Sequence, residues 1–240
     1  MESTTNTLAS VAEIKARFDN DVERFSNLDT GQLTTIDATL TMELCTSAAN
    51  YANPDATELL DIGCGAGNYS LKMLSKNNAL HCTINDLSLP MLERAKERLM
   101  AAGCTSIVML QQDMRHIDLP ALKYDIILAA AVLHHLRDDR DWEQVFTKMY
   151  QALKPGGSIW ISDLVAQDIP GVQQLFQDRY GDYLETLGGA EYKQKVFDYI
   201  AYEDTPRSVT FQMELLKKIG FSKVELLHKN GNFAAFGAIK

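Results

Sequence analysis

Residues 59–70 of the chain read Leu-Leu-Asp-Ile-Gly-Cys-Gly-Ala-Gly-Asn-Tyr-Ser. A short apolar run that ends in glycines is typical of a buried strand that turns directly into a helix. The alternate glycines Gly63, Gly65 and Gly67 allow positive φ angles, and without a Cβ atom they let a ligand approach the backbone closely. The stretch therefore predicts the first strand, turn and helix of a nucleotide-binding α/β sheet.

The spacing of these glycines argues against a dinucleotide site, which follows the pattern G-x-G-x-x-G. Counted from Gly63, the third glycine position is Asn68, and counted from Gly65 it is Ser70. The dinucleotide pattern therefore fails in both frames. A nicotinamide oxidoreductase is thus a disfavoured alternative, since it needs a cofactor that this turn should not hold.

Strands and helices alternate after residue 57, which predicts a parallel sheet wrapped by helices. The strand candidates are 58–62, 80–85, 107–111, 125–130 and 158–163, and helices are expected around 70–76, 91–101 and 142–153. Apolar residues also recur at helical spacing before the first strand. We expect one domain over residues 1–240, with an N-terminal helical cap over 10–50 and a lid insertion over 166–206.

The C-terminal end departs from this alternation. Residues 224–229 and 232–239 read as two strands joined by Asn230-Gly231. Asn-Gly is a strong hairpin signal, because both central residues of a type I′ turn need positive φ. The sequence therefore predicts a parallel sheet that is closed by an antiparallel hairpin.

Asp61, the Gly63–Gly67 turn and the closing hairpin together resemble the class I S-adenosylmethionine-dependent methyltransferases. The resemblance extends from about Phe18 to Lys240. It implies a Rossmann-like three-layer sandwich with a seven-stranded, mostly parallel sheet. It also implies methyl transfer from S-adenosyl-L-methionine, with S-adenosyl-L-homocysteine as the product.

Ligands of open parallel sheets bind beyond the carboxyl ends of the strands. Asp86 ends the second strand roughly 20 residues past Gly67, the spacing of an acid that accepts hydrogen bonds from a ribose diol. Ser88 is a good helix N-cap, which leaves Asp86 for the ligand. The resemblance implies that Asp113 accepts from the adenine amino group and that the Met114 backbone meets a ring nitrogen. The predicted cofactor-binding residues are Asp61, Gly63, Cys64, Gly65, Gly67, Asp86, Leu87, Asp113, Met114 and Ala130.

His134 and His135 follow the fourth strand and are candidates for a general base, because histidine titrates near neutrality. A structural role, in which a histidine binds the loop or the next helix, explains them as well. Methyl transfer from a sulfonium ion depends mainly on positioning, so the catalytic residues stay unassigned. No metal site is predicted, because adjacent histidines on one turn are not expected to converge and no third ligand is evident.

The segment 166–206 is rich in aromatic residues, which would shape an acceptor pocket and exclude water from it. Helical core packing or a dimer interface explains the same residues. Its aromatic residues are Phe176, Tyr180, Tyr183, Tyr192, Phe197, Tyr199 and Tyr202. The residues predicted to bind the substrate are Phe18, Arg24, Tyr180 and Arg207.

The chain has 23 basic against 32 acidic residues and a formal net charge of −9. A polyanion would be repelled at long range, so a small-molecule acceptor is favoured over a nucleic acid. No membrane partner is expected, because the longest apolar run, 126–133, is too short to cross a bilayer. The first ten residues lack a secretory signal, and the four cysteines form no C-x-x-C pair. We therefore expect a cytoplasmic protein and leave a homodimer open.

The chain also resembles carboxy-S-adenosylmethionine synthase, an enzyme of tRNA modification that alters the cofactor itself. The similarity lies in Phe18-Asp19-x-x-Val22, in Gly220-Phe221 and in Asn232-Phe233. That enzyme holds the extra carboxylate with an arginine in the helix before the Gly-Phe turn. Residues 209–216 contain no arginine, which favours ordinary S-adenosylmethionine. A non-catalytic S-adenosylmethionine-binding protein is a further alternative.

Overall fold

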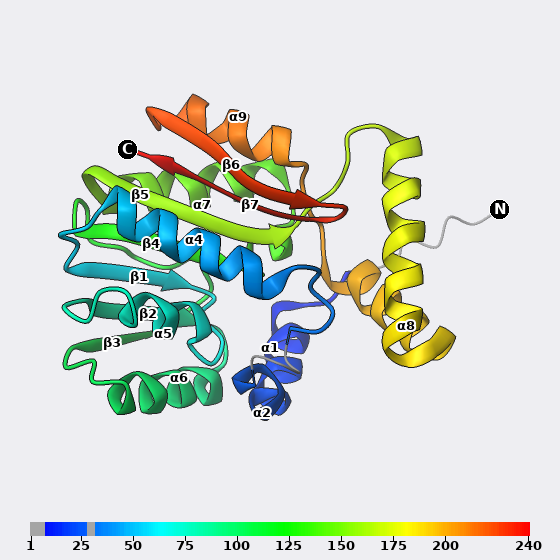
Figure 1. Cartoon of the computed structure of the whole chain (residues 1–240), viewed down its shortest axis with the longest axis horizontal. Coiled ribbons are helices and arrows are strands. Elements are labelled where there is room, and N and C mark those ends of the chain that lie inside the picture. The colour runs from blue at the N-terminus through cyan, green and yellow to red at the C-terminus, as the bar shows by residue number, and fades with distance from the viewer. Residues whose placement is uncertain (1–7, 28–31) are drawn as a thin grey trace.

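The computed structural model describes residues 8–27 and 32–240 (Figure 1). Within these residues, one seven-stranded sheet has the order β3-β2-β1-β4-β5-β7-β6, with β7 antiparallel to both β5 and β6 and the other pairs parallel. The strands are β1 (Glu58–Ile62), β2 (His81–Asp86), β3 (Ile107–Gln111), β4 (Tyr124–Ala130), β5 (Leu153–Leu164), β6 (Lys223–Asn230) and β7 (Phe233–Ile239). The predicted mostly parallel sheet with a closing antiparallel hairpin is confirmed.

Helices cover both faces of the sheet and give three layers (Figure 1). One face carries α4 (Ala38–Ala52), α5 (Asn68–Leu74) and α6 (Leu89–Ala101), and the other carries α7 (Asp139–Ala152) and α9 (Val209–Ile219). Successive strand residues point to opposite faces. Leu59 of β1 therefore packs in one core and Leu60 in the other.

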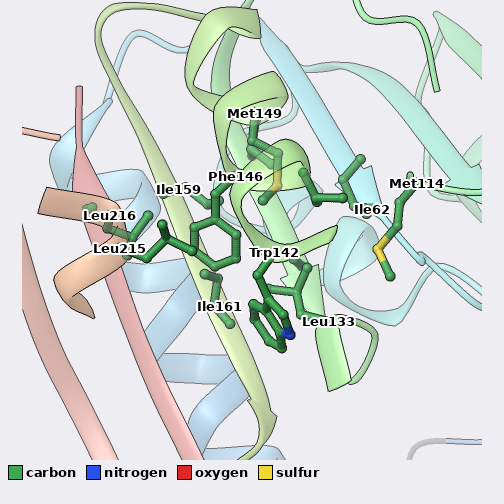
Figure 2. Close-up of a cluster of buried hydrophobic side chains, with 14 of the residues drawn as sticks. Ile62, Met114, Leu133, Trp142, Phe146, Met149, Ile159, Ile161, Leu215 and Leu216 are labelled. Carbon is green, nitrogen blue, oxygen red and sulfur yellow. The ribbon is translucent and has the colours of Figure 1, made fainter. Parts of the chain in front are cut away.

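The core between β5, α7 and α9 is built from large apolar side chains (Figure 2). Trp142 and Phe146 of α7 are fully buried and pack against one another, with ring centroids 5.7 Å apart. Ile159 and Ile161 of β5 and Leu216 of α9 belong to the same cluster, as Figure 2 shows. Burial of each such side chain contributes roughly 1.5–3 kcal/mol. This core fixes β4 and β5, whose carboxyl ends carry the candidate site.

Three helices lie beyond the carboxyl ends of the parallel strands: α1 (Val11–Asn20), α2 (Val22–Ser26) and α8 (Pro170–Glu203) (Figure 1). A capping box formed by Ser10 and Glu13 starts α1, and α8 bends where Gly188 and Gly189 leave helical geometry. No helix of residues 8–27 and 32–240 is both long enough and apolar enough to pass through a bilayer.

The structure differs from the predicted elements at three places. The predicted cap over 10–50 is divided, because α4 packs on β5 in the sandwich while α1 and α2 lie at the strand ends. Strand β5 starts at Leu153 instead of 158, and its pairing with β4 jumps from Leu153 to Ser158 across the Pro-Gly-Gly stretch. The hairpin loop is Gly231-Asn232, since Asn230 pairs with Phe233. Only Gly231 of these two has positive φ, so the loop is not the predicted type I′ turn.

Candidate functional site

A cavity lies at the carboxyl ends of the parallel strands, between the glycine turn after β1 and the helices α1, α2 and α8. This is where an open parallel sheet binds its ligand. Residues predicted to bind the cofactor and residues predicted to bind the substrate both line this cavity. The cofactor candidates that line it are Asp61, Gly63, Cys64, Gly65, Asp86, Leu87, Asp113, Met114 and Ala130. Gly67, which was also predicted to bind the cofactor, does not line the cavity.

The three glycines of the turn all have positive φ but meet different surroundings. A Cβ atom on Gly63 would lie 2.3 Å from Val132 Cγ2, so the loop after β4 packs on its bare backbone. A Cβ atom on Gly67 would lie 3.1 Å from that of Ala95, which shows that Gly67 serves the contact between α5 and α6. A Cβ atom on Gly65 would meet no described atom within 4 Å apart from its own residue and its two chain neighbours. Gly65 is therefore the glycine whose open side a ligand can approach.

Asp86 holds the glycine turn against the end of β2. Its Oδ2 accepts from the Gly65 N–H at 2.9 Å, and its Oδ1 accepts from the Ser88 N–H at 2.9 Å. Ser88 caps α6 as predicted, with its Oγ accepting from the Met91 N–H at 3.3 Å. Burial raises the pKa of Asp86. A carboxylate has about four acceptor sites, so Asp86 keeps acceptor capacity toward the cavity.

Asp61 lies beneath the glycine turn, in contact with α5. Its Oδ2 accepts from Ser70 Oγ at 2.6 Å, and its side chain is buried. Burial raises the pKa of Asp61 to about 7, and the hydrogen bond from Ser70 opposes this rise. The carboxyl group thus anchors the first turn of α5 to β1.

Asp113, predicted to meet adenine, makes an ion pair with Arg115. The Arg115 Nε donates to Oδ1 at 3.0 Å, and its Nη2 donates to Oδ2 at 2.6 Å. Burial tends to raise the pKa of Asp113, but hydrogen bonds from Arg115 more than offset it, so the pKa is lowered. The role toward adenine stays a prediction, and the arginine partner was not anticipated.

A cluster of two histidines and two aspartates forms the polar end of the cavity. His134 and His135 lie on a 3₁₀ turn, Leu133–His135, that follows β4. Asp163 comes from the carboxyl end of β5, and Asp204 follows α8. The prediction that the two adjacent histidines would not converge on one point is wrong. Their ring centroids lie 4.3 Å apart, and a nitrogen of each ring approaches the Asp204 carboxylate.

Asp163 orients His134. The ring Nδ1 donates to Asp163 Oδ1, while Asp163 Oδ2 accepts from the backbone N–H groups of Leu133 at 2.8 Å and His134 at 3.2 Å. The other ring nitrogen, Nε2, then lies 3.7 Å from Asp204 Oδ1. His135 Nδ1 lies 3.2 Å from the same oxygen.

Burial and charge act in opposite directions in this cluster. Burial disfavours charged His134, but the charges of Asp163 and Asp204 prevail and raise its pKa to about 9. Burial and the neighbouring His134 lower the pKa of His135. Burial tends to raise the pKa of Asp204, but the two histidines lower it overall. Asp163 was detectable from the sequence as an acid at a strand end, whereas Asp204 carried no such signal.

Three of the four predicted substrate contacts line the cavity: Phe18, Arg24 and Tyr180. Phe18 packs edge-on against His135, with centroids 6.0 Å apart, and Arg24 pairs loosely with Asp21 at 3.5 Å. The Tyr180 hydroxyl donates to the Thr34 carbonyl at 2.8 Å. Tyr180 also packs against Phe197 and Phe233, which bears out the core-packing explanation for part of the aromatic segment.

Arg207, the fourth predicted substrate contact, does not line the cavity. It pairs with Asp139 at 2.9 Å and lies against the Phe211 ring. Arg207 directly precedes Ser208, the N-cap of α9, and its partner Asp139 is the first residue of α7.

Contacts between α1 and the end of α8 cover the cavity, and sequence reasoning did not foresee them. Arg17 Nη2 pairs with Glu203 Oε2 at 2.5 Å, and the Ala9 N–H donates to the Tyr202 carbonyl at 2.8 Å. Arg137 joins both segments, donating to the carbonyls of Glu203 and Ala9 at 2.7 Å each. These contacts make one cover from two segments that are distant in sequence.

Comparisons with known proteins agree with this geometry. A family model described as a methyltransferase domain matches residues 59–157. A carboxy-S-adenosyl-L-methionine synthase of Shewanella woodyi is 30% identical over 201 residues, which cover 80% of this chain and 79% of that protein. A demethylmenaquinone methyltransferase of Listeria monocytogenes is 26% identical over 183 residues, covering 75% of this chain and 76% of that protein.

Solved methyltransferase structures share the fold. Human N-acetylserotonin methyltransferase in complex with S-adenosylmethionine superposes with a TM-score of 0.64 at 17% identity, over 98% of this chain and 63% of that chain. An S-adenosylmethionine-dependent methyltransferase structure from Methanococcus maripaludis, described as putative, gives 0.61 at 19% identity, over 92% and 93%. The matched domain, the relatives and the strand order together show that this chain belongs to the class I S-adenosylmethionine-dependent methyltransferases.

Proposed function

We propose that this protein transfers a methyl group from S-adenosylmethionine to a small-molecule acceptor that is enclosed between the glycine turn and α8. The observation that carries the proposal is the continuity of one cavity. It joins Gly65 and Asp86, at the cofactor end, to Phe18, Tyr180 and the histidine cluster, at the acceptor end.

The cofactor end has the groups that an adenosyl ligand needs. Asp86 offers acceptor sites to a ribose diol, and Gly65 leaves its side of the turn open. Asp86 and Ser88 already hold one another through the backbone, so the acidic group is in place before a ligand arrives. A group held ready in this way lowers the ordering cost of binding.

The reaction needs little covalent help from the protein. A nucleophile on the acceptor attacks the sulfonium methyl in line, a bond to carbon forms, and the bond from carbon to sulfur breaks, with S-adenosylhomocysteine leaving. The cofactor's own positive charge activates the methyl group, so the protein acts by positioning the reactants and excluding water. The cover formed by α1 and α8 supports the exclusion of water.

The acceptor end favours a molecule with an apolar body and a polar group. Phe18, Leu164 and Phe233 supply apolar walls, and His134 and Asp204 supply the polar end. The enclosure and the net charge of −9 both favour a small molecule over a polyanionic nucleic acid.

Carboxylated S-adenosylmethionine is a less favoured ligand, although a relative is named as its synthase. A second carboxylate needs an uncommitted cation. Arg207 lies outside the cavity, Arg17 pairs with Glu203, and Arg115 pairs with Asp113. Arg24 has the loosest ion pair among these arginines. Arg137, which also lines the cavity, has both terminal nitrogens bonded to the carbonyls of Glu203 and Ala9. Arg24 and Arg137 are therefore the residues that a carboxylate would engage.

Calorimetry on the full chain tests the proposal, with S-adenosylmethionine, S-adenosylhomocysteine, carboxy-S-adenosylmethionine and NAD as ligands. Asp86→Ala should weaken S-adenosylmethionine by roughly 10- to 100-fold, since a charged acceptor of two hydrogen bonds is lost. Asp118→Ala is the matched control, because Asp118 is exposed and lies outside the cavity. Binding of NAD alone, or equal binding by Asp86→Ala, would refute the cofactor assignment. A preference for the carboxylated ligand would refute the ordinary methyl donor, and methyl turnover separates an enzyme from a binding protein.

A further inference from the structure

Three side-chain donor atoms meet at the polar end of the cavity: His134 Nε2, His135 Nδ1 and Asp204 Oδ1. All of them lie within 4.8 Å of one another. Asp204 Oδ1 is 3.2 Å from His135 Nδ1 and 3.7 Å from His134 Nε2. Nitrogen and oxygen ligands bound at roughly 2.1 Å to one metal ion stand roughly 3–3.5 Å apart. The two spacings from the carboxylate are close to this range.

These donor atoms face one another without satisfying one another. Asp204 Oδ1 is buried and has no hydrogen-bond partner among the described residues, and the Asp204 side chain is only 4% exposed. His135 Nδ1 makes a long 3.5 Å contact with the Glu203 carbonyl. Buried carboxylate oxygens are normally hydrogen-bonded. A cation bound by all three donor atoms would give this oxygen the partner that it lacks.

Asp163 binds the ring nitrogen of His134 that does not face Asp204. It accepts from Nδ1, which fixes the ring orientation and directs Nε2 toward Asp204. Metal-binding histidines commonly donate their second nitrogen to a carboxylate in this way, and this raises the basicity of the ligand. Asp163 is itself held by the N–H groups of Leu133 and His134.

The charges of the cluster also favour a divalent cation. Asp163 and Asp204 are both buried. Within residues 8–27 and 32–240, neither forms an ion pair with a lysine or an arginine. A divalent cation bound by two neutral imidazoles would balance the two carboxylates, whereas one protonated histidine would balance only one of them. Buried charges are stable where they are paired or coordinate a metal.

We propose that His134, His135 and Asp204 form a binding site for one first-row divalent transition-metal ion, with Asp163 as the outer partner of His134. Two imidazoles and one carboxylate suit zinc or ferrous iron and leave a coordination position open. The proposal depends on the geometry of these four residues and not on the identity of the methyl acceptor.

The test uses the full chain after removal of metals with a chelator. Zn²⁺ is titrated by calorimetry against the wild type, Asp204→Asn, His135→Gln and Asp163→Asn, with Mg²⁺ as the cation control. His81→Gln is the matched control variant, because His81 faces Glu58 at 3.0 Å on the surface and lies outside the cavity. Melting curves of the metal-free variants check that each is folded.

We expect one Zn²⁺ per chain in the wild type and in His81→Gln, and no comparable binding of Mg²⁺. Asp204→Asn and His135→Gln should each weaken Zn²⁺ by at least about 100-fold. Asp163→Asn should keep the stoichiometry and weaken Zn²⁺ by roughly 10- to 100-fold, as an outer partner does. The absence of stoichiometric Zn²⁺ binding, or unchanged binding by Asp204→Asn, would overturn the proposal.

A spectroscopic measurement on the wild type keeps the proposal testable if a variant fails to fold. Co²⁺ bound by the histidines and Asp204 should show visible d–d bands without a thiolate charge-transfer band. A thiolate band would place the metal on a cysteine such as Cys64, which lines the same cavity, and would overturn the assignment. S-adenosylmethionine titrated into the metal-free protein tests the proposed function separately, because its binding residues lie at the other end of the cavity.

Discussion

The glycine turn allows one chemical change to be made at two neighbouring positions with opposite consequences. Gly63→Ala and Gly65→Ala each add a single methyl group at a residue with positive φ, +63° and +50° respectively. The added group meets Val132 in the first variant and open space in the second. The pair therefore separates folding stability from ligand binding.

The expected destabilisation follows from strain and overlap. A non-glycine residue in the left-handed region costs roughly 1–2 kcal/mol, and both variants carry this cost. At Gly63 the new Cβ atom would also lie 2.3 Å from Val132 Cγ2 and 2.6 Å from Val132 Cβ. Overpacking of this kind costs roughly 1–3 kcal/mol more. We therefore expect losses of about 2–5 kcal/mol for Gly63→Ala and about 1–2 kcal/mol for Gly65→Ala.

Urea unfolding and S-adenosylmethionine calorimetry measure the two effects. Gly63→Ala should lose the greater part of its stability through the contact with Val132. Gly65→Ala should stay folded but bind the cofactor at least about 10-fold more weakly, because its methyl group occupies the side of the turn that the ligand approaches. For a chain of this length, 1 kcal/mol corresponds to roughly 2–4 °C in melting temperature.

Two results would refute the reasoning. Equal destabilisation by the two variants would mean that the Val132 contact does not govern the turn. Undiminished cofactor binding by Gly65→Ala would mean that the ligand does not approach the turn at Gly65, and the cofactor site would have to be reassigned.

Three further predictions concern the framework of the site. Asp61→Asn should be more stable than the wild type at pH 8, by up to about 4 kcal/mol, and the gain should shrink toward pH 4 in urea unfolding. The native pKa of about 7 exceeds the unfolded value of about 3.9, so wild-type stability falls as the pH rises through this window. Arg17→Ala should cost about 2–3 kcal/mol by leaving Glu203 unpaired and buried, and adding Glu203→Gln should restore part of the loss in melting temperature. Asp125→Ala should cost about 1–3 kcal/mol of stability, because its carboxylate accepts from the Thr57 and Glu58 N–H groups. These groups lie at the amino ends of the strands, away from the cavity, so S-adenosylmethionine binding should not change. Weaker binding of S-adenosylmethionine in calorimetry would contradict this.

The backbone around the predicted cofactor site was predictable because it is local in sequence. Strand β1 has the predicted bounds 58–62, because an apolar run ended by glycine leaves little freedom in where the strand stops. Ser88 caps α6 as predicted, because serine directly before a helical pattern is a favoured N-cap residue. The rule that ligands bind at the carboxyl ends of strands then brings Asp61 and Asp86 to one edge.

The acceptor half depended on contacts that no local pattern specifies. Asp204 reaches His134 only because α8 bends at two glycines and returns its end to the sheet. The ion pair of Arg17 with Glu203 joins residues that are 186 positions apart. The hairpin loop was misplaced by one residue because Gly231 follows one asparagine and precedes another. The register of β6 with β7, in which Asn230 pairs with Phe233, places the loop at Gly231-Asn232.

The two halves also differ in what they inherit from the family. The matched methyltransferase domain covers 59–157, which includes the glycine turn, Asp86 and both histidines. The cover that encloses the acceptor is made by α1 and α8, outside that match. Its contacts involve Arg137 and Glu203, and under the proposed function they would have to open before an acceptor enters, whereas Asp86 is held in place by backbone N–H groups. Under the proposed function, cofactor recognition therefore rests on residues inside the matched domain, and acceptor choice rests on α1 and α8, which lie outside it.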